Sequence, residues 1–114
     1  MRLTLAAILY CALCSSPALA FNASLYGLGD GYYGKRTACG NIHKPGDTVA
    51  HKTLPCGTKV RITGPNGATR IVTVTDRGPF IKGRVWDLNS SLRYVLGCHG
   101  ICNVKAVVLT DRDK

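Results

Sequence analysis

The segment TVTDRGPF, residues 73–80, ends a run of β-forming residues on a carboxylate. If the strand continues to Asp76, period-two geometry places this side chain on the same face as Val72 and Val74. An inward carboxyl at the edge of a core favours the protonated form, which a general acid requires. Arg77 would favour the charged form if its guanidinium folded back onto Asp76, and the sequence leaves this competition open. The simpler alternative is a plain turn, since Asp, Gly and Pro all favour turns.

Cysteines offer a second kind of chemistry. Beyond the N-terminal segment they are Cys39, Cys56, Cys98 and Cys102. In an exported protein of this size their default state is two disulfides, with three possible connectivities. A zinc site is the alternative, because the segment CHGIC places His99 between two thiols. Its spacing lacks a second matching pair, so we expect disulfides, no metal and no cofactor.

The first twenty residues have the pattern of a secretory signal peptide. Arg2 gives a positive start, an apolar stretch follows, and ALA at 18–20 is a small-residue cleavage signal before Phe21. The segment is too short and too poorly flanked for a membrane anchor. We expect a signal peptide at 1–20, one domain at 21–114, and an exported protein, periplasmic or secreted, without stable membrane insertion.

The chain is strongly basic, with a formal net charge of +9 at pH 7. Loss of Arg2 with the leader would leave 14 basic and 6 acidic residues, a net charge of +8. Such a surface attracts polyanions over long distances. The basic residues are spread along the chain without a recognisable nucleic-acid-binding motif, so we expect no nucleic-acid partner. An anionic cell-wall glycan fits an exported protein better, and we expect a monomer that binds it.

Short β-rich runs alternate with turn signals along the chain, a pattern typical of a small all-β domain. Residues 57–63 alternate apolar and basic side chains, and a turn at 64–67 leads to a partner strand at 69–75. Further expected elements are a strand at 84–88, one helix at 89–97 with Asn89 or Ser90 as N-cap and Gly97 past its end, and a strand at 103–109.

Two motifs carry a resemblance to a known family. AHKTLP at 50–55 is followed by DRGPFIKGRVWDL at 76–88. This combination resembles the RlpA-like (rare lipoprotein A-like) family of cell-wall proteins. The likeness begins at GYYGKRTACG (31–40) and continues to VKAVVL (104–109), which covers nearly all of the chain after the leader. The resemblance implies a six-stranded double-psi β-barrel, in agreement with the short strands and the one short helix expected above.

The resemblance also implies a lytic transglycosylase that acts on peptidoglycan glycan strands. Such enzymes cut the bond between N-acetylmuramic acid and N-acetylglucosamine without water. One carboxylic acid protonates the glycosidic oxygen and then accepts the proton of the sugar's own 6-hydroxyl, leaving a 1,6-anhydro end. The positions that match the family's acid and histidine are Asp76 and His51, which we expect to be catalytic. Asp87 also matches and is a second acidic candidate, expected with Tyr33 and Arg77 to bind substrate.

Several of these residues have a purely structural alternative. His51 could satisfy a hydrogen bond of the barrel, and Asp87 could cap or brace the following helix. Tyr32, Tyr33 and Trp86 could stack on sugar rings, although aromatic residues in a small barrel are more often part of the core.

The cysteines of TACG and LPCG resemble those of the related expansin barrels, in which these positions are bridged. This likeness implies a disulfide between Cys39 and Cys56, and proximity across a short turn favours one between Cys98 and Cys102. Expansins loosen wall polymers without clear hydrolysis. A non-catalytic, expansin-like glycan-binding module is therefore the alternative function. A secreted inhibitor or effector of the barwin-like kind is a third class, without a sequence feature of its own.

Overall fold

The computed structural model describes residues 19–110 of the chain. Residues 1–18 of the predicted signal peptide lie outside this part, and its last two residues, Leu19 and Ala20, open the first strand. Cleavage after Ala20 and a domain that begins at the next residue stay predictions. Within the described residues, no helix has the length and apolar character needed to cross a membrane.

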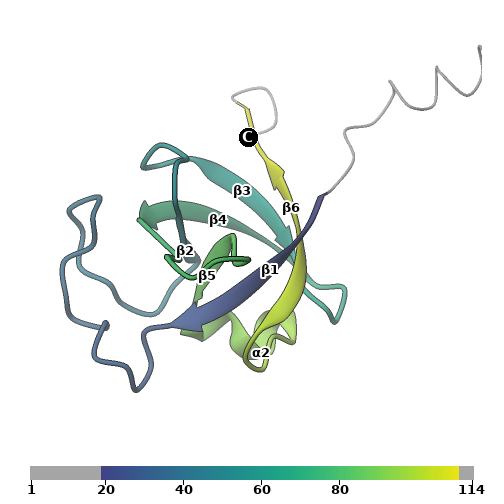
Figure 1. Cartoon of the computed structure of the whole chain (residues 1–114), viewed down its shortest axis with the longest axis horizontal. Coiled ribbons are helices and arrows are strands. Elements are labelled where there is room, and N and C mark those ends of the chain that lie inside the picture. Colours follow the sequence, from purple (N-terminus) through teal and green to yellow (C-terminus); the bar gives the residue numbers. More distant parts are fainter. Residues whose placement is uncertain (1–18, 111–114) are drawn as a thin grey trace, which may run out of the picture.

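Six strands within residues 19–110 form one closed sheet (Figure 1). The elements are β1 (Leu19–Tyr26), β2 (Thr48–His51), β3 (Lys59–Thr63), β4 (Thr69–Asp76), β5 (Trp86–Asn89), the 3₁₀ turn η1 (Ser90–Leu92), the helical turn α2 (Arg93–Leu96) and β6 (Cys102–Val108). Around the barrel the order is β1-β5-β2-β4-β3-β6. The pairs β1/β5 and β2/β4 are parallel, and the other neighbouring pairs are antiparallel. The predicted all-β barrel of six strands is confirmed.

Alternate side chains of the strands fill the interior of the barrel. Val60 and Ile62 of β3 and Val72 and Val74 of β4 are fully buried, as the period-two pattern predicts. Each such side chain contributes about 1.5–3 kcal/mol when it is removed from water. Trp86 of β5 belongs to the same cluster, so it is a core residue and does not offer a face to a sugar.

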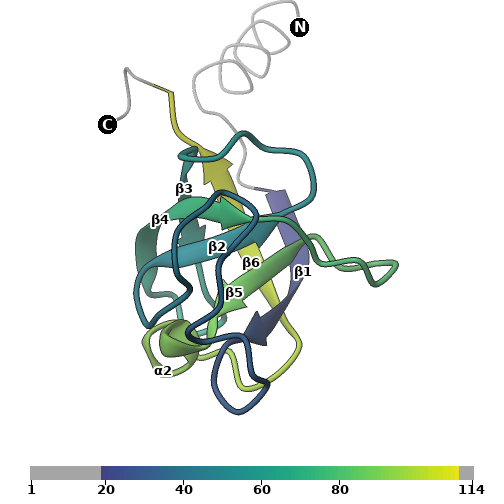
Figure 2. The ribbon, with the colours of Figure 1, turned by 90° about the vertical axis from the view of Figure 1, so that its left-hand side faces the viewer.

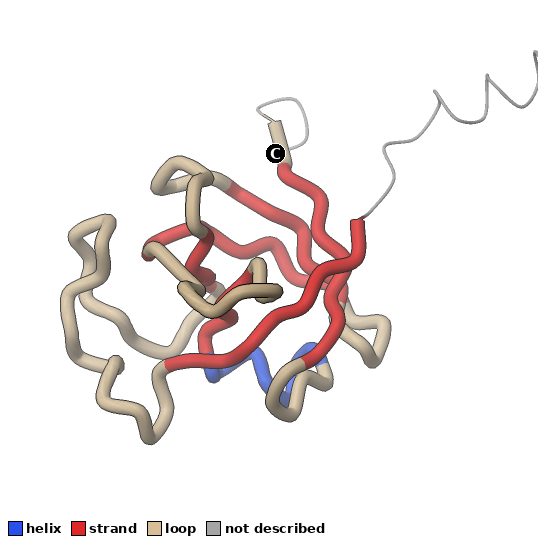
Figure 3. Tube along the Cα trace, in the orientation of Figure 1, coloured by secondary structure: helices blue, strands red, loops and turns tan. Residues whose placement is uncertain are grey.

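The turn between β3 and β4 packs against the helical segment, which Figure 3 shows in blue. Gly67 has a φ of 86°, a left-handed conformation that glycine adopts without steric cost, and its N–H closes the turn on the carbonyl oxygen of Gly64 (3.0 Å). Asn66 Nδ2 donates a hydrogen bond to the carbonyl oxygen of Val95 (3.0 Å). Gly64 passes so close to the helix that a Cβ on it would lie 2.1 Å from the carbonyl oxygen of Leu96. This contact fixes the hairpin against α2.

The single helix expected at 89–97 is present as two consecutive short turns, η1 and α2. Asn89 is the N-cap, because its side chain accepts a hydrogen bond from the N–H of Ser91 (3.1 Å). Gly97 ends α2 in a left-handed conformation with a φ of 71°, as expected. Because Asn89 caps the helix, Asp87 is not needed for that task.

The structure adds two strands that the sequence pattern did not indicate, β1 and β2. β2 lies between β4 and β5, with β4 parallel and β5 antiparallel to it. The long loop between β1 and β2, residues 27–47, runs along one side of the barrel, at the left of Figures 1 and 3. In Figure 2 the loop between β4 and β5, drawn in green, stands out from the barrel.

The part of the chain that the structure describes holds two disulfides, Cys39–Cys56 and Cys98–Cys102, with Cα–Cα distances of 5.8 and 5.5 Å. Both predicted pairings are confirmed. The first joins the loop 27–47 to the loop that follows β2, and the second closes the connection between α2 and β6. Because the sulfur atoms of CHGIC are bonded to each other, they are not thiolate ligands for zinc.

Candidate active site

A cavity of about 310 Å³ opens where β1 and β4 end and β5 begins. Its volume is at the lower end of the range of small-molecule sites. The lining residues are Tyr26, Tyr32, Lys35, Arg36, Asp76, Arg77, Gly78, Phe80 and Asp87. Of the predicted site residues, the structure brings Asp76, Arg77 and Asp87 together here, whereas His51 and Tyr33 are not among the lining residues.

The register of β2 explains how the two carboxylates meet. Ala50 of β2 is the cross-strand partner of both Asp76 in β4 and Asp87 in β5. Partners in a ladder point to the same face of a sheet, so both carboxylates lie on one face with Ala50 between them. With neighbouring strands about 4.8 Å apart, the backbones of the two aspartates are roughly 10 Å apart.

The face that carries Asp76 differs from the sequence expectation. Val49 of β2 pairs with Val74. The next residue of β2, Ala50, pairs with Asp76, so Thr75 is an extra residue in β4. A β-bulge of this kind re-aims the side chain that follows it. The prediction that Asp76 shares the face of the buried valines of β4 is therefore wrong, and the bulge places it on the face of the other carboxylate.

Backbone N–H groups hold Asp76 in place. Its Oδ1 accepts hydrogen bonds from the N–H groups of Ala38 and Arg77, both at 2.9 Å. The Arg77 guanidinium donates instead to the backbone carbonyl oxygens of His51 (3.2 Å) and Leu54 (2.7 Å). Arg77 thus braces the wall of the cavity, and its guanidinium does not fold back onto the Asp76 carboxylate.

Asp87 has surroundings that favour its protonated form. Burial is the largest cause that raises the pKa of this carboxyl, and the negative charges of Asp30 and Asp76 act in the same direction. The hydroxyl of Ser24, which donates a hydrogen bond to Asp87 Oδ1, and the positive charge of Arg84 oppose this shift. The net effect is a raised pKa, as a proton donor near neutral pH needs.

Tyr26, which the sequence did not single out, lies between the two carboxylates and a buried histidine. Its ring stacks on His43 with centroids 4.2 Å apart, and Tyr32 meets it edge-on at 5.9 Å. Its hydroxyl is buried next to the side chains of Thr75 and Asp76, which both influence its pKa. Burial, and then the charges of Asp76 and Asp87, raise the pKa of Tyr26. The hydroxyl therefore stays protonated beside the carboxylates.

His51 performs the structural role that the sequence left open. Its Nδ1 accepts hydrogen bonds from the N–H groups of Thr53 (3.2 Å) and Leu54 (3.1 Å), and its ring packs on the tryptophan of β5. With Nδ1 as an acceptor, the neutral ring carries its proton on Nε2. Burial is the largest cause that lowers the pKa of His51, and the positive charges of Arg77 and Lys52 add to it. A catalytic role for His51 stays a prediction.

Adjacent tyrosines of the loop 27–47 have different surroundings. The Tyr33 hydroxyl donates to Asn89 Oδ1, and its ring centroid lies 4.9 Å from that of His43. Tyr32 lines the cavity and is 54% exposed. Substrate binding by Tyr33 stays a prediction, and Tyr32 is the tyrosine that faces the cavity.

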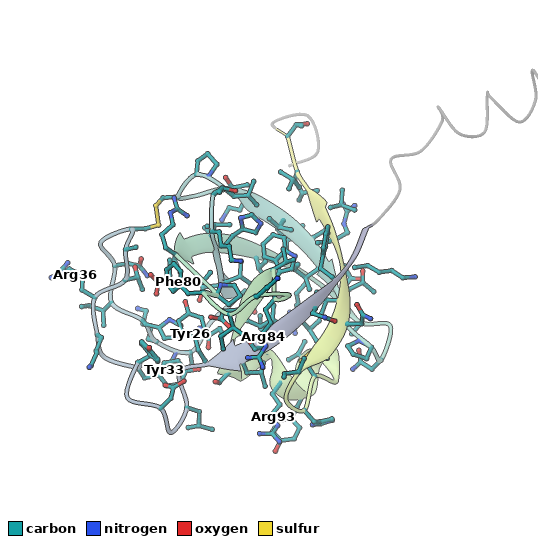
Figure 4. The ribbon with its side chains drawn as sticks, in the orientation of Figure 1. Tyr26, Tyr33, Arg36, Phe80, Arg84 and Arg93 are labelled. Carbon is teal, nitrogen blue, oxygen red and sulfur yellow. A yellow bond between two sulfur atoms is a disulfide. The ribbon has the colours of Figure 1, made fainter. Side chains whose placement is uncertain are left out.

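Lys35, Arg36 and Phe80 also line the cavity without having been predicted. Figure 4 labels Arg36 and Phe80 on the same side of the barrel as Tyr26. A sequence signal for Phe80 existed, because Phe80 and Ile81 are consecutive apolar residues in a turn, where polar residues are usual. The loop 27–47 offered no comparable signal, since its basic residues look like those of any solvated loop.

Comparison with known proteins agrees with this arrangement. A family model described as "Lytic transglycolase" matches residues 18–107. The chain belongs to the lytic transglycolase family. The match spans almost the whole barrel, and it confirms the RlpA-like double-psi β-barrel that the sequence motifs imply.

Curated members of the lytic transglycolase family are similar over most of this chain. The probable endolytic peptidoglycan transglycosylase RlpA of Nostoc sp. is 45% identical over 103 residues, which cover 85% of this chain and 28% of the relative. The endolytic peptidoglycan transglycosylase RlpA of Vibrio cholerae is 40% identical over 92 residues, which cover 77% of this chain and 34% of the relative. The chain thus spans about a third or less of the length of these relatives.

Solved structures add a second group of similar proteins. The apo expansin of Clavibacter michiganensis has a TM-score of 0.65 and 28% sequence identity, over 83% of this chain and 52% of the expansin. A mutant of the Clavibacter expansin was solved in complex with cellohexaose. It has a TM-score of 0.65 and 27% sequence identity, over 83% of this chain and 52% of the expansin. The likeness to expansins that the cysteines imply is therefore present in the fold.

Proposed function

We propose that this domain is a lytic transglycosylase, which cuts the bond between N-acetylmuramic acid and N-acetylglucosamine in peptidoglycan glycan strands. The reaction leaves a 1,6-anhydro end. The observation that carries this proposal is the pair of carboxylates, Asp76 and Asp87, on one face of the sheet and in one cavity. The names of the curated relatives, peptidoglycan transglycosylases, support both the substrate and the reaction.

The surroundings of the two carboxyls suggest a division of labour. In the proposed step, protonated Asp87 gives its proton to the glycosidic oxygen as the bond from that oxygen to the sugar C1 breaks. The carboxylate of Asp76 stabilises the positive charge that develops at C1. The 6-oxygen of the same sugar then bonds to C1, and its proton passes to Asp87. The acid is restored, and no water is consumed.

This assignment rests on the environment of each carboxyl. Burial raises the pKa of Asp87, which favours the protonated form that an acid needs. Asp76 accepts two backbone hydrogen bonds through Oδ1, an arrangement that suits an acceptor. Asp76, predicted from the sequence as the acid, is here its partner carboxylate.

Mass spectrometry of the sugars released from purified peptidoglycan tests the proposal. We expect anhydro ends from the wild type and a loss of about 10²-fold or more in Asp87→Asn and in Asp76→Asn. Asp47→Asn is the control, because Asp47 is exposed and does not line the cavity. Release of reducing ends without anhydro ends would show that the two carboxylates act hydrolytically instead.

An expansin-like module that binds wall glycan without cutting it is the second candidate, favoured by the likeness to the Clavibacter expansin. The same variants separate the two functions. A binder would retain peptidoglycan in a pull-down after Asp76→Asn and would release no anhydro sugars in any form. The transglycosylase would lose product formation in that variant.

Peptidoglycan lies outside the cytoplasm, so the proposed function requires an extracytoplasmic location. Export through the predicted signal peptide at 1–20, to the periplasm or the medium, and action as a monomer complete the proposal. Detection of a mature N-terminus at Phe21 and elution at the monomer mass in size-exclusion chromatography are the corresponding measurements.

A further inference from the structure

Phe80 exposes an unusually large apolar surface in the cavity that holds the carboxylates. Its side chain is 84% exposed, and it lines the same cavity as Asp76 and Asp87. It belongs to the loop between β4 and β5, which stands out from the barrel in Figure 2. An exposed aromatic ring gains nothing for the stability of the fold, whereas it provides a large apolar area to a ligand.

Gly78 lies between this ring and one of the acids. A Cβ on Gly78 would lie 3.5 Å from Asp87 Oδ2 and 3.6 Å from Phe80 Cε2. The carboxylate and the ring edge are thus both within contact distance of one point. Gly78 and Pro79 are buried, so the segment that carries the ring is held by the protein, and the ring itself is not.

The part of the lining that comes from the loop 27–47 adds a second aromatic ring and positive charge. Tyr32, from the loop 27–47, is 54% exposed. Lys35 and Arg36 of the same loop line the cavity and are exposed. The cavity therefore combines apolar ring surface with hydrogen-bond donors and carboxylate acceptors, which suits a ligand with apolar faces and polar edges.

We propose that Phe80 is the stacking platform of a sugar-binding subsite next to the reacting bond, with Tyr32 as its second aromatic contact. A pyranose ring has C–H groups on its faces and hydroxyl groups around its edge. Its face would cover Phe80, while its hydroxyls would meet Lys35, Arg36 and the carboxylates. This proposal rests on the proposed action on a glycan and adds the residue that holds one of its sugars.

Binding of chitohexaose, an uncharged N-acetylglucosamine polymer, tests the subsite separately from catalysis. We expect Phe80→Ala to bind about tenfold more weakly than the wild type at both low and high salt, because stacking does not depend on ionic strength. Phe80→Trp should restore binding. The matched control is Tyr94→Ala, since Tyr94 is 78% exposed but lies outside the cavity lining, and its binding should equal that of the wild type.

Because the Phe80 ring is exposed, Phe80→Ala should melt at the wild-type temperature. A loss of chitohexaose binding in this variant then reflects the lost contact between the ring and the sugar. Equal binding by the wild type and Phe80→Ala would overturn the subsite, whether or not anhydro sugars are formed. Glycan binding that needs Phe80, without any anhydro product, would support the subsite and overturn the transglycosylase.

The adjacent exposed Ile81 gives this loop a second apolar side chain, and a membrane surface is the other partner that such a tip could meet. Vesicles of equimolar phosphatidylglycerol and phosphatidylethanolamine provide the probe. Binding to vesicles that is lost in Phe80→Ala, with chitohexaose binding unchanged, would overturn the sugar subsite in favour of a lipid contact. We expect no difference between wild type and variant on these vesicles.

Discussion

At the scale of single residues, the hydrogen bond from Ser24 opposes the effect of burial on the pKa of Asp87. The Ser24 hydroxyl stabilises the charged carboxylate and so lowers the pKa of Asp87, against the raising effect of burial. Ser24→Ala removes this hydrogen bond, and the pKa of Asp87 should rise further. Because a general acid works while protonated, the alkaline limb of kcat/KM against pH should move to higher pH.

Ser24→Thr, which keeps a hydroxyl at this position, is the control and should leave the alkaline limb in place. An unmoved limb in Ser24→Ala would show that the proton comes from a group other than Asp87. This pH readout separates a tuned acid from a serine that only supports the barrel.

His51 links stability to pH. Its folded-state pKa lies below the unfolded value of 6.5, so its contribution to stability is present above that pH and is lost as pH falls through the folded pKa. His51→Ala removes the acceptor of the Thr53 and Leu54 N–H groups, which are partly open to water, at a cost of about 0.5–1.5 kcal/mol near neutral pH. Urea denaturation near pH 7.5 and near pH 5 should show a smaller acid-side loss of stability in the variant than in the wild type. An equal acid-side loss in both proteins would exclude His51 as its source.

The strand pattern pointed to Asp76 and the family resemblance added Asp87 as candidate acids, but neither could assign the neighbouring tyrosines. Asp76 stands out because it ends a run of β-forming residues, and Asp87 because it matches the DL of the family motif. Tyr32 and Tyr33 are chemically alike and adjacent, and the path of the loop decides that Tyr32 lines the cavity while Tyr33 bonds to Asn89. Such a path depends on distant contacts, which local sequence does not contain.

At the scale of elements, the contact between the β3–β4 turn and α2 leaves no room for a side chain at Gly64. Gly64→Ala would place its methyl group against the carbonyl oxygen and Cβ of Leu96, at 2.1 and 2.5 Å. We expect a loss of about 1–3 kcal/mol in the free energy of unfolding, the usual cost of overpacking. Chemical denaturation measures it.

Gly46→Ala is the matched control, since the atom nearest to a Cβ on Gly46 is a backbone oxygen at 3.9 Å. This variant should retain the wild-type stability. Equal stability of both variants would show that the turn can move away from α2 without cost.

A strand could be predicted from the sequence only where its own residues alternate clearly between apolar and polar side chains. Val60 and Ile62 alternate with basic residues, so β3 could be found from the sequence. The bulge at Thr75 could not be found, because it is defined by the pairing of β4 with β2, and β2 is only four residues long. The effect of the bulge is large, because one extra residue moves the Asp76 carboxylate to the face opposite that of Val72 and Val74.

At the scale of the whole molecule, the excess of positive charge should assist the proposed binding to peptidoglycan, an anionic polymer. The chain after the predicted leader has a net charge of +8, and interactions between exposed charges are screened as salt rises. Retention on insoluble peptidoglycan should therefore weaken between low and moderate ionic strength. Chitin, which lacks the charge, is the control and should show little salt dependence. Salt-independent retention on both polymers would mean that the charge does not contribute to binding.

The two ends of the described chain leave the barrel as neighbours. Leu19 at the start of β1 pairs with Ala106 near the end of β6, and Figure 1 shows both ends away from the loop 27–47 that carries part of the cavity wall. This domain corresponds to 28% of the Nostoc relative. A further domain fused at either end would therefore emerge from the side of the barrel where the two ends meet, away from the loop 27–47. The barrel is in this sense a portable unit, to which protein engineering can attach a second module at either terminus.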